Sequence, residues 1–520
     1  MSEVILLSDT LSHGEIGNSR YMAPYVIASQ LENAGFDARV IDYFTRIDDF
    51  FNYIESFLTE KILMIGISTT FLMPPASKAH VGRESSFCKF LWLSSEDELQ
   101  RWFAQLRALL NKFNPNAKIV LGGTKAVNAD FDKNVYGIVD FINIGAADLS
   151  LIDFVTALKK GARPEFIITE RGTNILDNRT QAAKKHCPET NYLRKYAIQP
   201  NESLPIEISR GCVFNCRFCS FDRTSSARKD EQTLSAEFRR NYENYGTTVY
   251  HFCDDCFNDA RSKVESVCNV ILKLPFKIEW ISYARVDLSI RAPETLEMMI
   301  ESGAKGLYFG VESLNSVVAK NAGKGVPSEM VKEFLIDFRR KYSDRCLLQA
   351  SLIAGLPGET TESFLDTGKW MLENASIDFL CLGPLTLAPY VEKLDKLMVD
   401  YSEYIRRPEA FGFTKVSFEP YYWEHATMNS DQAKYLAQQL FTQWRKKNNT
   451  FLRSIWLYPL MRSLGYSWED IVLMSRDPSV TSRWYSEVPT KFRNYINKYH
   501  ADLQSLNRQS KSSNGILHTV

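Results

Sequence analysis

The sequence predicts an α/β protein in which a doubly wound parallel sheet precedes a partial (β/α)6 barrel and a helical C-terminal region. Short apolar runs alternate with helical segments in two separate series, and the alternation stops near residue 400. Strands that alternate with helices pair in parallel through right-handed crossovers. We therefore expect a doubly wound, Rossmann-like domain over residues 1–160, a connector over 161–203, the barrel over 204–400, a helical region over 401–506 and a polar, disordered tail over 507–520.

The first series predicts strands that end in small or polar residues. Helical segments are expected over 21–34, 96–113 and 149–158, and strands over 4–7, 38–41, 62–68, 118–121 and 139–144. From Pro74 to Ser95 the rhythm breaks, which indicates an insertion. Ligands of doubly wound sheets bind beyond the carboxyl ends of the strands. The residues that leave room there for a large flat ligand are Ser68, Thr69, Gly122, Gly123 and Gly145.

The second series predicts six βα units. Its strands are expected over 206–209, 248–252, 277–283, 306–311, 347–353 and 378–382, and its helices over 234–244, 261–272, 293–301, 328–341 and 361–373. Six such units form an incomplete barrel, in which chemistry takes place at the carboxyl ends of the strands.

Composition excludes several classes of protein. The chain has 520 residues, with 62 basic and 62 acidic side chains, so no net charge favours nucleic acid as a partner. It has no stretch of about 18 apolar residues and begins without a signal peptide, so we expect a cytoplasmic protein that does not bind membranes. Its ten cysteines are then reduced thiols or metal ligands.

Three of these cysteines lie in one short loop after a predicted strand. Cys212, Cys216 and Cys219 follow the pattern CxxxCxxC, and Gly211 allows a tight backbone at the loop entrance. Three thiolates can hold three irons of a cubane cluster and leave the fourth iron open for a substrate. The alternatives are a zinc site that lacks its fourth ligand, or three thiols without metal. The spacing favours the cluster.

This loop, with Phe218 before its last cysteine, resembles the radical S-adenosylmethionine (SAM) superfamily. Further similarities follow in order at the later strands of the barrel, in the segments 252–255, 280–287, 310–313 and 354–359. The resemblance implies that Cys212, Cys216 and Cys219 bind a [4Fe–4S] cluster and act in catalysis. An electron from this cluster would cleave SAM to a 5′-deoxyadenosyl radical, which removes a hydrogen atom from the substrate.

The same resemblance implies which residues contact SAM. Asp254 and Asp255 lie in the segment near the SAM amino group, and Arg285 is placed to pair with the SAM carboxylate. Glu312 would hold the ribose hydroxyls or the methionyl end, and Gly355 begins the turn beside adenine. For Arg285 and Glu312 the alternative is an ordinary ion pair of a barrel.

Residues 1–160 resemble the cobalamin-binding domain that precedes the barrel in one class of this superfamily. Two departures stand against the resemblance. The acidic turn after the last strand reads Gly145-Ala-Ala-Asp148, and the DxHxxG element that supplies a histidine to cobalt is absent, since His13 has the wrong spacing from Asp9. Bound cobalamin and a vestigial domain therefore both stay open, and we favour cobalamin.

The sequence thus predicts a cobalamin-dependent radical SAM enzyme that methylates or rearranges an unactivated carbon of a small molecule or peptide. The alternative is a radical SAM enzyme with a vestigial domain that performs cyclisation, oxidation or methylthiolation. Either needs an external electron donor such as flavodoxin or ferredoxin. Two other features are less informative: Cys253 and Cys256 form a CxxC without a further pair, and His425 lies in an aromatic segment that either lines the substrate cavity or packs a domain junction.

Overall fold

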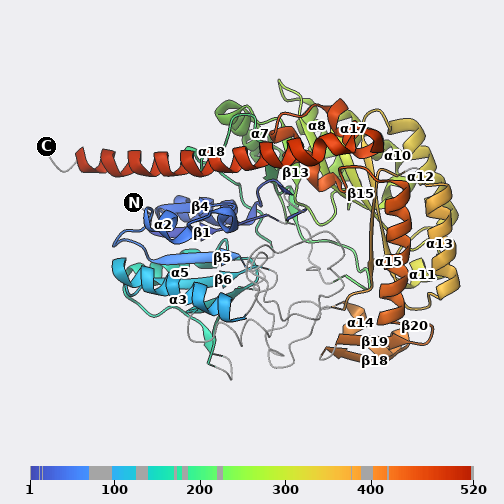
Figure 1. Cartoon of the computed structure of the whole chain (residues 1–520), viewed down its shortest axis with the longest axis horizontal. Coiled ribbons are helices and arrows are strands. Elements are labelled where there is room, and N and C mark those ends of the chain that lie inside the picture. The colour runs from blue at the N-terminus through green and yellow to red at the C-terminus, as the bar shows by residue number, and fades with distance from the viewer. Residues whose placement is uncertain are drawn as a thin grey trace.

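Two parallel sheets organise the chain, and both are visible side by side in Figure 1, the first at the left and the barrel at the right. The structure is a computed structural model of the whole chain. It describes residues 2–10, 12–13, 16–68, 96–123, 139–168, 172–178, 185–219, 227–375, 377–387, 402–418 and 421–516. Thr69 and the expected insertion over 74–95 lie outside the described residues.

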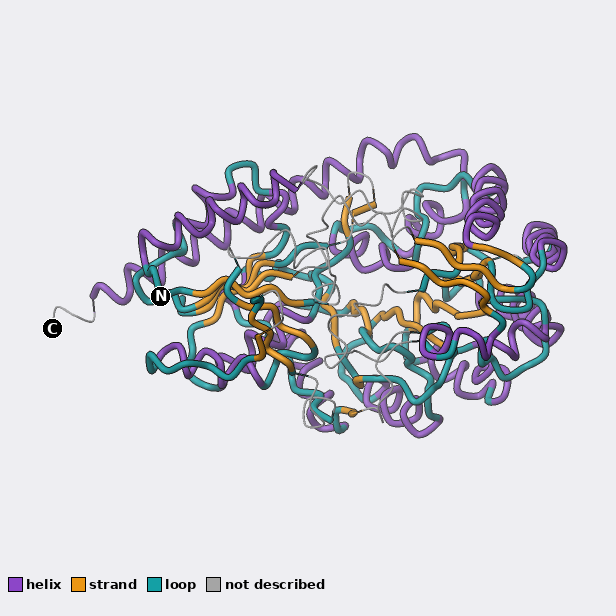
Figure 2. Tube along the Cα trace, turned by 90° about the horizontal axis from the view of Figure 1, so that it is seen from below, coloured by secondary structure: helices purple, strands orange, loops and turns teal. Residues whose placement is uncertain are grey.

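The first sheet has the order β4-β1-β5-β6-β7-β9-β8, and its strands are parallel apart from β8. The five strands expected from the sequence are β1 (Val4–Leu7), β4 (Ala38–Ile41), β5 (Met64–Ser68), β6 (Lys118–Gly122) and β7 (Phe141–Ile144). Figure 2 shows helices on both faces of this sheet. The helices between its strands include α1 (Ala23–Asn33), α3 (Glu96–Phe113) and α5 (Ser150–Lys159). Successive strands are added on opposite sides of β1, first β4 and then β5, so the strand order reverses there and a ligand crevice is expected at the carboxyl ends of β1 and β5.

The expected connector contributes to this sheet. β8 (Ile167–Ile168) and β9 (Asn174–Asp177) extend it beyond β7, although the sequence over 161–203 showed no sustained period. Both strands are short, and β9 buries only Ile175 and Leu176. Such a strand is held by pairing with β7 and by the bond from Asn174 Nδ2 to Asp140 O at 2.9 Å, neither of which leaves a pattern in the sequence.

The second sheet is the predicted partial barrel of six parallel strands in chain order. Its strands are β10 (Leu204–Ile206), β13 (Val249–Phe252), β14 (Glu279–Ala284), β15 (Ala304–Glu312), β16 (Leu347–Ala354) and β17 (Phe379–Pro384). Between them run α7 (Glu231–Tyr245), α8 (Arg261–Leu272), α10 (Pro293–Glu301), α12 (Ser328–Tyr342) and α13 (Thr361–Glu373). The α/β fold class predicted from the sequence is confirmed.

The C-terminal region is mainly helical, as expected, but it also contains strands. It includes α15 (Ser430–Lys447), α16 (Tyr458–Ser463), α17 (Trp468–Arg476) and the 36-residue α18 (Thr481–Ile516). A small antiparallel sheet, β18 (Phe413–Phe418), β19 (Tyr421–His425) and β20 (Met428–Asn429), was not expected. The sequence predicts a helical region here, but a run of tyrosine, tryptophan and phenylalanine fits the helical period and the strand period equally well.

The expected disorder of the polar tail is wrong for residues 507–516, which continue α18. Figure 1 shows α18 crossing from the barrel to the first sheet, where it passes α2 (Phe50–Glu55). There Asn507 Nδ2 and Lys511 Nζ donate to Ser56 O at 2.8 and 2.9 Å. These polar side chains satisfy a carbonyl at the end of α2, so their polarity reflects a cap rather than disorder.

A fully buried ion pair network fixes the first sheet against α18. Arg20 Nη1 lies 3.1 Å from Asp42 Oδ2, and Arg20 Nε lies 2.5 Å from Glu202 Oε1. The guanidinium also stacks 4.3 Å from the ring centre of Tyr499 on α18. Removing one member of a buried pair leaves an uncompensated charge, so this network holds the two parts in one arrangement. No helix in the described part of the chain is long and apolar enough to cross a membrane.

Candidate functional site

The three predicted cluster cysteines lie in one loop at the carboxyl end of β10. Gly211 takes a φ of +86°, which glycine adopts without strain, and the loop turns tightly where Cys219 N donates to Cys216 O at 3.0 Å. All three thiols are half-buried and none forms a disulfide. No three described His, Cys, Asp or Glu side chains already converge as a metal site. The donor set fits an iron–sulfur cluster once the three thiols turn toward one another around it.

The loop after α11 (Ser316–Asn321) braces the cysteine loop from the side. Arg217 N donates to Ala322 O at 3.1 Å, and Arg217 Nη1 donates to Asn321 O at 2.8 Å. Gly323 has a φ of +90°, and a Cβ added there would lie 3.1 Å from Asn215 O. Glycine is therefore required where these two loops approach.

Arg285 joins the end of β14 to the cysteine loop. Its Nε and Nη2 form a bidentate pair with Asp287 at 2.9 and 2.7 Å, its Nη1 lies 3.0 Å from Cys216 Sγ, and it stacks 4.0 Å from the ring centre of Phe214. Burial alone would lower the pKa of Arg285, but the bonds to Asp287 and Cys216 hold it above its ordinary value. The side chain is thus a permanent cation beside Cys216, a predicted cluster ligand. Its pairing with the SAM carboxylate stays a prediction.

Asp254 and Asp255 have different surroundings. The buried Asp254 accepts bonds from the backbone N–H groups of Ile208 and Ser209 at 2.9 and 3.0 Å and pairs with Lys263 at 2.8 Å. These bonds draw the chain out of β10 and direct it toward the cysteine loop, so the geometry gives Asp254 a positioning role. Asp255 is half-buried, and its charge acts on Cys212, whose pKa burial raises. Contacts of either carboxylate with SAM stay predictions.

Glu312 ends β15 in the left-handed region, with a φ of +68°. A residue with a side chain costs about 1 kcal/mol or more there, and such strain clusters at functional sites. Two contacts hold it: Lys324 Nζ lies 3.2 Å from Glu312 Oε1, and Ser351 Oγ donates to Glu312 Oε2 at 2.8 Å. Lys324 Nζ also lies 5.7 Å from the ring centre of Phe218. Glu312 is therefore connected to the cysteine loop through Lys324.

The turn that begins at Gly355 closes on a buried carboxyl. Gly355 has a φ of +86° and donates from its N–H to Glu359 Oε2 at 2.7 Å, and burial raises the pKa of Glu359 to about 7. His425 Nε2 lies 3.1 Å from Gly355 O, and the His425 ring stacks on Trp423. Burial lowers the pKa of His425. His425 therefore packs a junction beneath the turn, which is one of the two interpretations left open by the sequence.

The carboxyl ends of the first sheet carry the small residues expected for a large ligand. Ser68 and Gly122 are register partners on β5 and β6, and among the described residues a Cβ added at Gly122 would meet only Asn143 Cβ, at 3.8 Å. Gly123 and Gly145 have φ values of +96° and +89°. At the end of β1, the buried hydroxyls of Ser8 and Thr10 have no hydrogen-bond partner among the described residues. Unsatisfied polar groups beside small residues are what a polar flat ligand needs.

Asp148 and Arg210 connect the two sheets at these ends. Arg210 directly precedes the cysteine loop, and its Nη1 donates to both oxygens of the buried Asp148 at 3.2 and 2.9 Å. Its Nε and Nη2 donate to Glu207 at 3.0 and 2.8 Å. Burial alone would lower the pKa of Arg210, and these bonds raise it. The turn after β7 is therefore fixed against the loop that carries Cys212.

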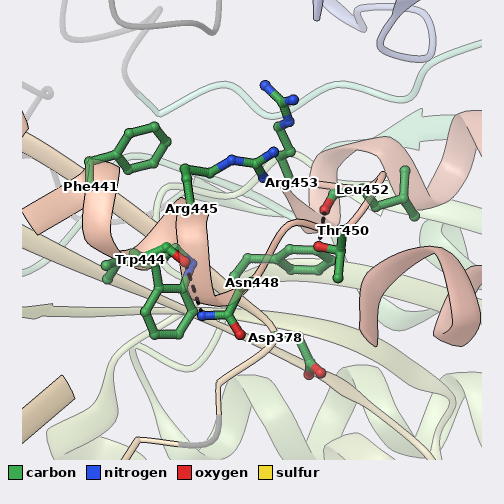
Figure 3. Close-up of a pocket in the computed structure, with 10 residues that line it drawn as sticks. Asp378, Phe441, Trp444, Arg445, Asn448, Thr450, Leu452 and Arg453 are labelled. Carbon is green, nitrogen blue, oxygen red and sulfur yellow. Dashed lines mark hydrogen bonds between the residues drawn. The ribbon is translucent and has the colours of Figure 1, made fainter. Parts of the chain in front are cut away.

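A pocket beside Asp378 lies at the opposite end of the barrel strands. Figure 3 shows it between Trp444, Asn448 and Thr450, with bonds from Asn448 Nδ2 to Trp444 O and from Thr450 Oγ1 to Leu452 O. Its volume of about 10 Å³ holds no more than one water molecule. It is not a ligand site.

Residues 206–371 match the family model of the radical SAM superfamily. This segment begins in β10 and ends in α13, so it contains the cysteine loop, Arg285, Glu312 and the Gly355 turn. The chain carries a radical SAM domain.

Known proteins resemble the chain beyond this domain. An uncharacterized methyltransferase of Pyrococcus horikoshii is 24% identical over 281 residues, which cover 50% of this chain and 59% of that protein. An anaerobic magnesium-protoporphyrin IX monomethyl ester cyclase of Cereibacter sphaeroides is 25% identical over 217 residues, which cover 39% of this chain and 35% of the cyclase. The chain thus covers less than two thirds of the length of each of these curated relatives.

Two solved structures share the fold. The cobalamin-dependent SAM radical enzyme OxsB aligns with 99% of this chain and 81% of its own, with a TM-score of 0.57 and 14% identity. The radical SAM methyltransferase TsrM of Kitasatospora setae aligns with 74% of each chain, with a TM-score of 0.54 and 16% identity. The alignment with OxsB includes the first sheet as well as the radical SAM domain.

The structure adds residues that the sequence analysis did not select. Lys324, Ser351 and Asp287 hold the predicted site residues Glu312 and Arg285, and Arg210 connects the cysteine loop to Asp148. Lys324 lies between two glycines, which is a weak signal of a functional loop. The other residues give no signal, because isolated serine, arginine and aspartate residues are common in any protein sequence, mostly at the surface.

Proposed function

We propose that the chain is a radical SAM enzyme in which Cys212, Cys216 and Cys219 hold a [4Fe–4S] cluster that cleaves SAM to a 5′-deoxyadenosyl radical. The observation that carries the proposal is the radical SAM domain, whose barrel strands bring Arg285, Glu312 and the Gly355 turn to the side on which the cysteine loop lies. When bound, the cluster and SAM supply the one-electron chemistry. The residues of the chain orient them: Arg285 holds Cys216, and Lys324 links Glu312 to Phe218.

The test is reductive SAM cleavage by anaerobically reconstituted protein. The wild-type chain is expected to show the broad absorbance of the cluster and to release 5′-deoxyadenosine with dithionite as the reductant. A variant with Cys212, Cys216 and Cys219 all changed to alanine is expected to lose both. The matched control is Cys268→Ala, which removes a buried thiol on α8, outside the site. Release of 5′-deoxyadenosine by the triple variant would reject the proposal.

We further propose that the first sheet binds cobalamin, so that the reaction is methylation or rearrangement of an unactivated carbon. Support comes from the register pair Ser68 and Gly122, the open space beside Gly122 and the unsatisfied hydroxyls of Ser8 and Thr10. The pairing of Arg210 with Asp148 would keep this ligand close to the cluster. In this proposal no histidine binds cobalt, and the substrate is a small molecule or peptide.

Retention of hydroxocobalamin after desalting tests this second proposal. Gly122→Phe is a sharper probe than a change at Gly123, since Gly123 has a φ of +96° and any side chain there would strain the backbone as well as block the site. Gly122→Phe is expected to abolish corrin retention and to leave cluster absorbance unchanged. His13→Ala is expected to retain the corrin. If the wild-type chain retains none, the alternative with a vestigial domain and cyclisation, oxidation or methylthiolation becomes the better account.

Two further predictions from the sequence remain part of the proposal. The electron donor is an external protein such as flavodoxin or ferredoxin, and the location is cytoplasmic. The electron donor is tested by adding purified reduced flavodoxin and measuring reduction of the cluster through the cluster absorbance.

A further inference from the structure

The side chains inside the barrel form layers. The layer nearest the amino-terminal ends of the strands packs against the C-terminal region. Val249, Ile281, Leu347 and Phe379 form one apolar cluster with Ile455, which belongs to the short helix η6 (Ile455–Leu457). Gln349 Oε1 anchors this helix by accepting a bond from Ile455 N at 2.9 Å. This apolar cluster occupies the end of the barrel opposite the cysteine loop.

The next layer is aromatic, and we call it the aromatic floor: His251, Tyr283, Tyr308 and Trp456. Ring centres are 4.8 Å apart for His251 and Trp456, 4.5 Å for Tyr283 and Trp456, and 4.8 Å for Tyr283 and Tyr308. His251 and Tyr283 lie two positions beyond Val249 and Ile281 on their strands, and Trp456 follows Ile455 on η6. Tyr308 lies two positions beyond Gly306, where an added Cβ would be 3.1 Å from Ile455 Cβ. The floor therefore faces the carboxyl ends of the strands, where the cysteine loop lies.

Part of the floor is accessible inside the barrel. Tyr283 is 37% exposed, although it lies on a central strand of the barrel, and Cys381 beside Tyr308 is exposed as well. The Tyr283 ring lies against the rings of Tyr308 and Trp456. Its accessible surface therefore borders a space above the floor, which we call the chamber. Burial raises the pKa of Tyr283 and lowers that of His251 to about 4.

Small residues line this chamber above the floor. Gly310, Ser351 and Gly383 follow Tyr308, Gln349 and Cys381 by two positions on β15, β16 and β17. The Glu312 side chain fills the interior beside the first two of these residues, since a Cβ added at Gly310 would lie 2.5 Å from Glu312 Oε1 and Ser351 Oγ donates to Glu312 Oε2. A Cβ added at Gly383 would meet no described atom within 4 Å. Large side chains occupy such positions in filled barrels, so the space between the floor and the cysteine loop lies on the side of Gly383.

We propose that this chamber binds a neutral, planar aromatic or conjugated group of the substrate, which stacks on the aromatic floor. The use of the chamber for a substrate rests on the proposed radical SAM function. The floor offers ring faces and carries no charge at neutral pH, because His251 is deprotonated there. Ring stacking adds a preference of about three- to tenfold over an equally apolar saturated group.

Calorimetric titration with two matched probes tests the proposal on the reconstituted full chain. 2-Naphthol is planar and decahydro-2-naphthol is its saturated counterpart, and both are neutral at pH 7. The wild-type chain is expected to bind 2-naphthol three- to tenfold more tightly. Tyr283→Phe is expected to keep this preference and Tyr283→Leu to lose it. Tyr435→Leu, which alters a 62% exposed tyrosine on α15, is the matched control and is expected to change nothing.

Gly383→Phe provides an independent arm because a Cβ at this position meets no described atom within 4 Å and the added ring would occupy the chamber. It is expected to weaken both probes more than tenfold while cluster absorbance is unchanged. Equal affinity of the wild-type chain for the two probes, or unchanged binding in Gly383→Phe, would overturn the proposal. Probe binding needs no SAM cleavage, so a chain that stacks 2-naphthol but releases no 5′-deoxyadenosine would refute the proposed function alone.

Discussion

Glu359 makes the stability of the barrel depend on pH in a defined window. Its carboxyl is fully buried, and burial raises its pKa from 4.5 to about 7. The folded chain therefore holds this proton more tightly than the unfolded chain does. Between pH 4.5 and 7 the folded state binds more protons, so stability is lost as the pH rises through this window and the loss is complete above pH 7. At about 1.4 kcal/mol for each pH unit, the loss amounts to about 3 kcal/mol.

Glu359→Gln reproduces the protonated side chain at every pH and removes this loss. The variant is expected to unfold at the same temperature as wild type below pH 4.5 and at a higher one above pH 7. For a domain of this size the gain is about 6–12 °C. Thermal unfolding followed by circular dichroism at a series of pH values measures it.

The difference between variant and wild type isolates Glu359 from other titrating groups. Asp9, whose pKa burial raises to about 6, acts in the same direction, and His251, whose pKa burial lowers to about 4, acts in the opposite one. Both contribute equally to the two proteins and cancel. Glu362→Gln changes an exposed glutamate of α13 and is expected to give a flat difference. A flat difference for Glu359→Gln as well would refute the reasoning.

Three further predictions concern contacts that hold the site. Arg210→Met leaves two buried carboxylates without their cation, so it is expected to lower the local free energy of unfolding by about 3 kcal/mol. Hydrogen exchange over 204–212 should then be about a hundredfold faster. Asp148→Asn is expected to cost only about 1–2 kcal/mol, because the Arg210 guanidinium keeps its pairing with Glu207. Gly355→Ala would place its Cβ 2.5 Å from Trp423, and it is expected to lower the unfolding temperature far more than Gly412→Ala, which shares the positive φ but meets no atom. Deletion of the chain from Asn507 onward is expected to speed hydrogen exchange in α2, and unchanged exchange there would contradict the cap at Ser56.

Elements that repeat a strong pattern could be predicted from the sequence, and elements held by one partner could not. The helices over 261–272, 293–301 and 361–373 have the expected bounds because their apolar faces recur at helical spacing. β9 and the end of α18 are different. The first depends on an edge of the sheet and the second on one carbonyl of α2, and neither requirement is visible in the residues that meet it.

The same distinction separates the cysteines from the residues that place them. The spacing of Cys212, Cys216 and Cys219 predicts an iron–sulfur cluster site within eight residues of sequence. Their position in space is set from far along the chain. Asp254 directs the backbone before the loop, Asp148 holds its entrance from the other sheet, and Ala322 and Arg285 brace it after the turn, the last of these through Cys216 itself.

These four contacts come from both sheets, so the position of the cysteine loop depends on the position of the two sheets relative to each other. Arg20 and Glu202 supply that condition, because they fix the first sheet, the segment before β10 and α18 through one buried charge network. A substitution in this network is therefore expected to disturb the loop although it lies outside the site. A single sequence predicts which residues carry the chemistry of a radical SAM domain. The distances between its cofactors depend on pairs of residues that only the folded chain brings together.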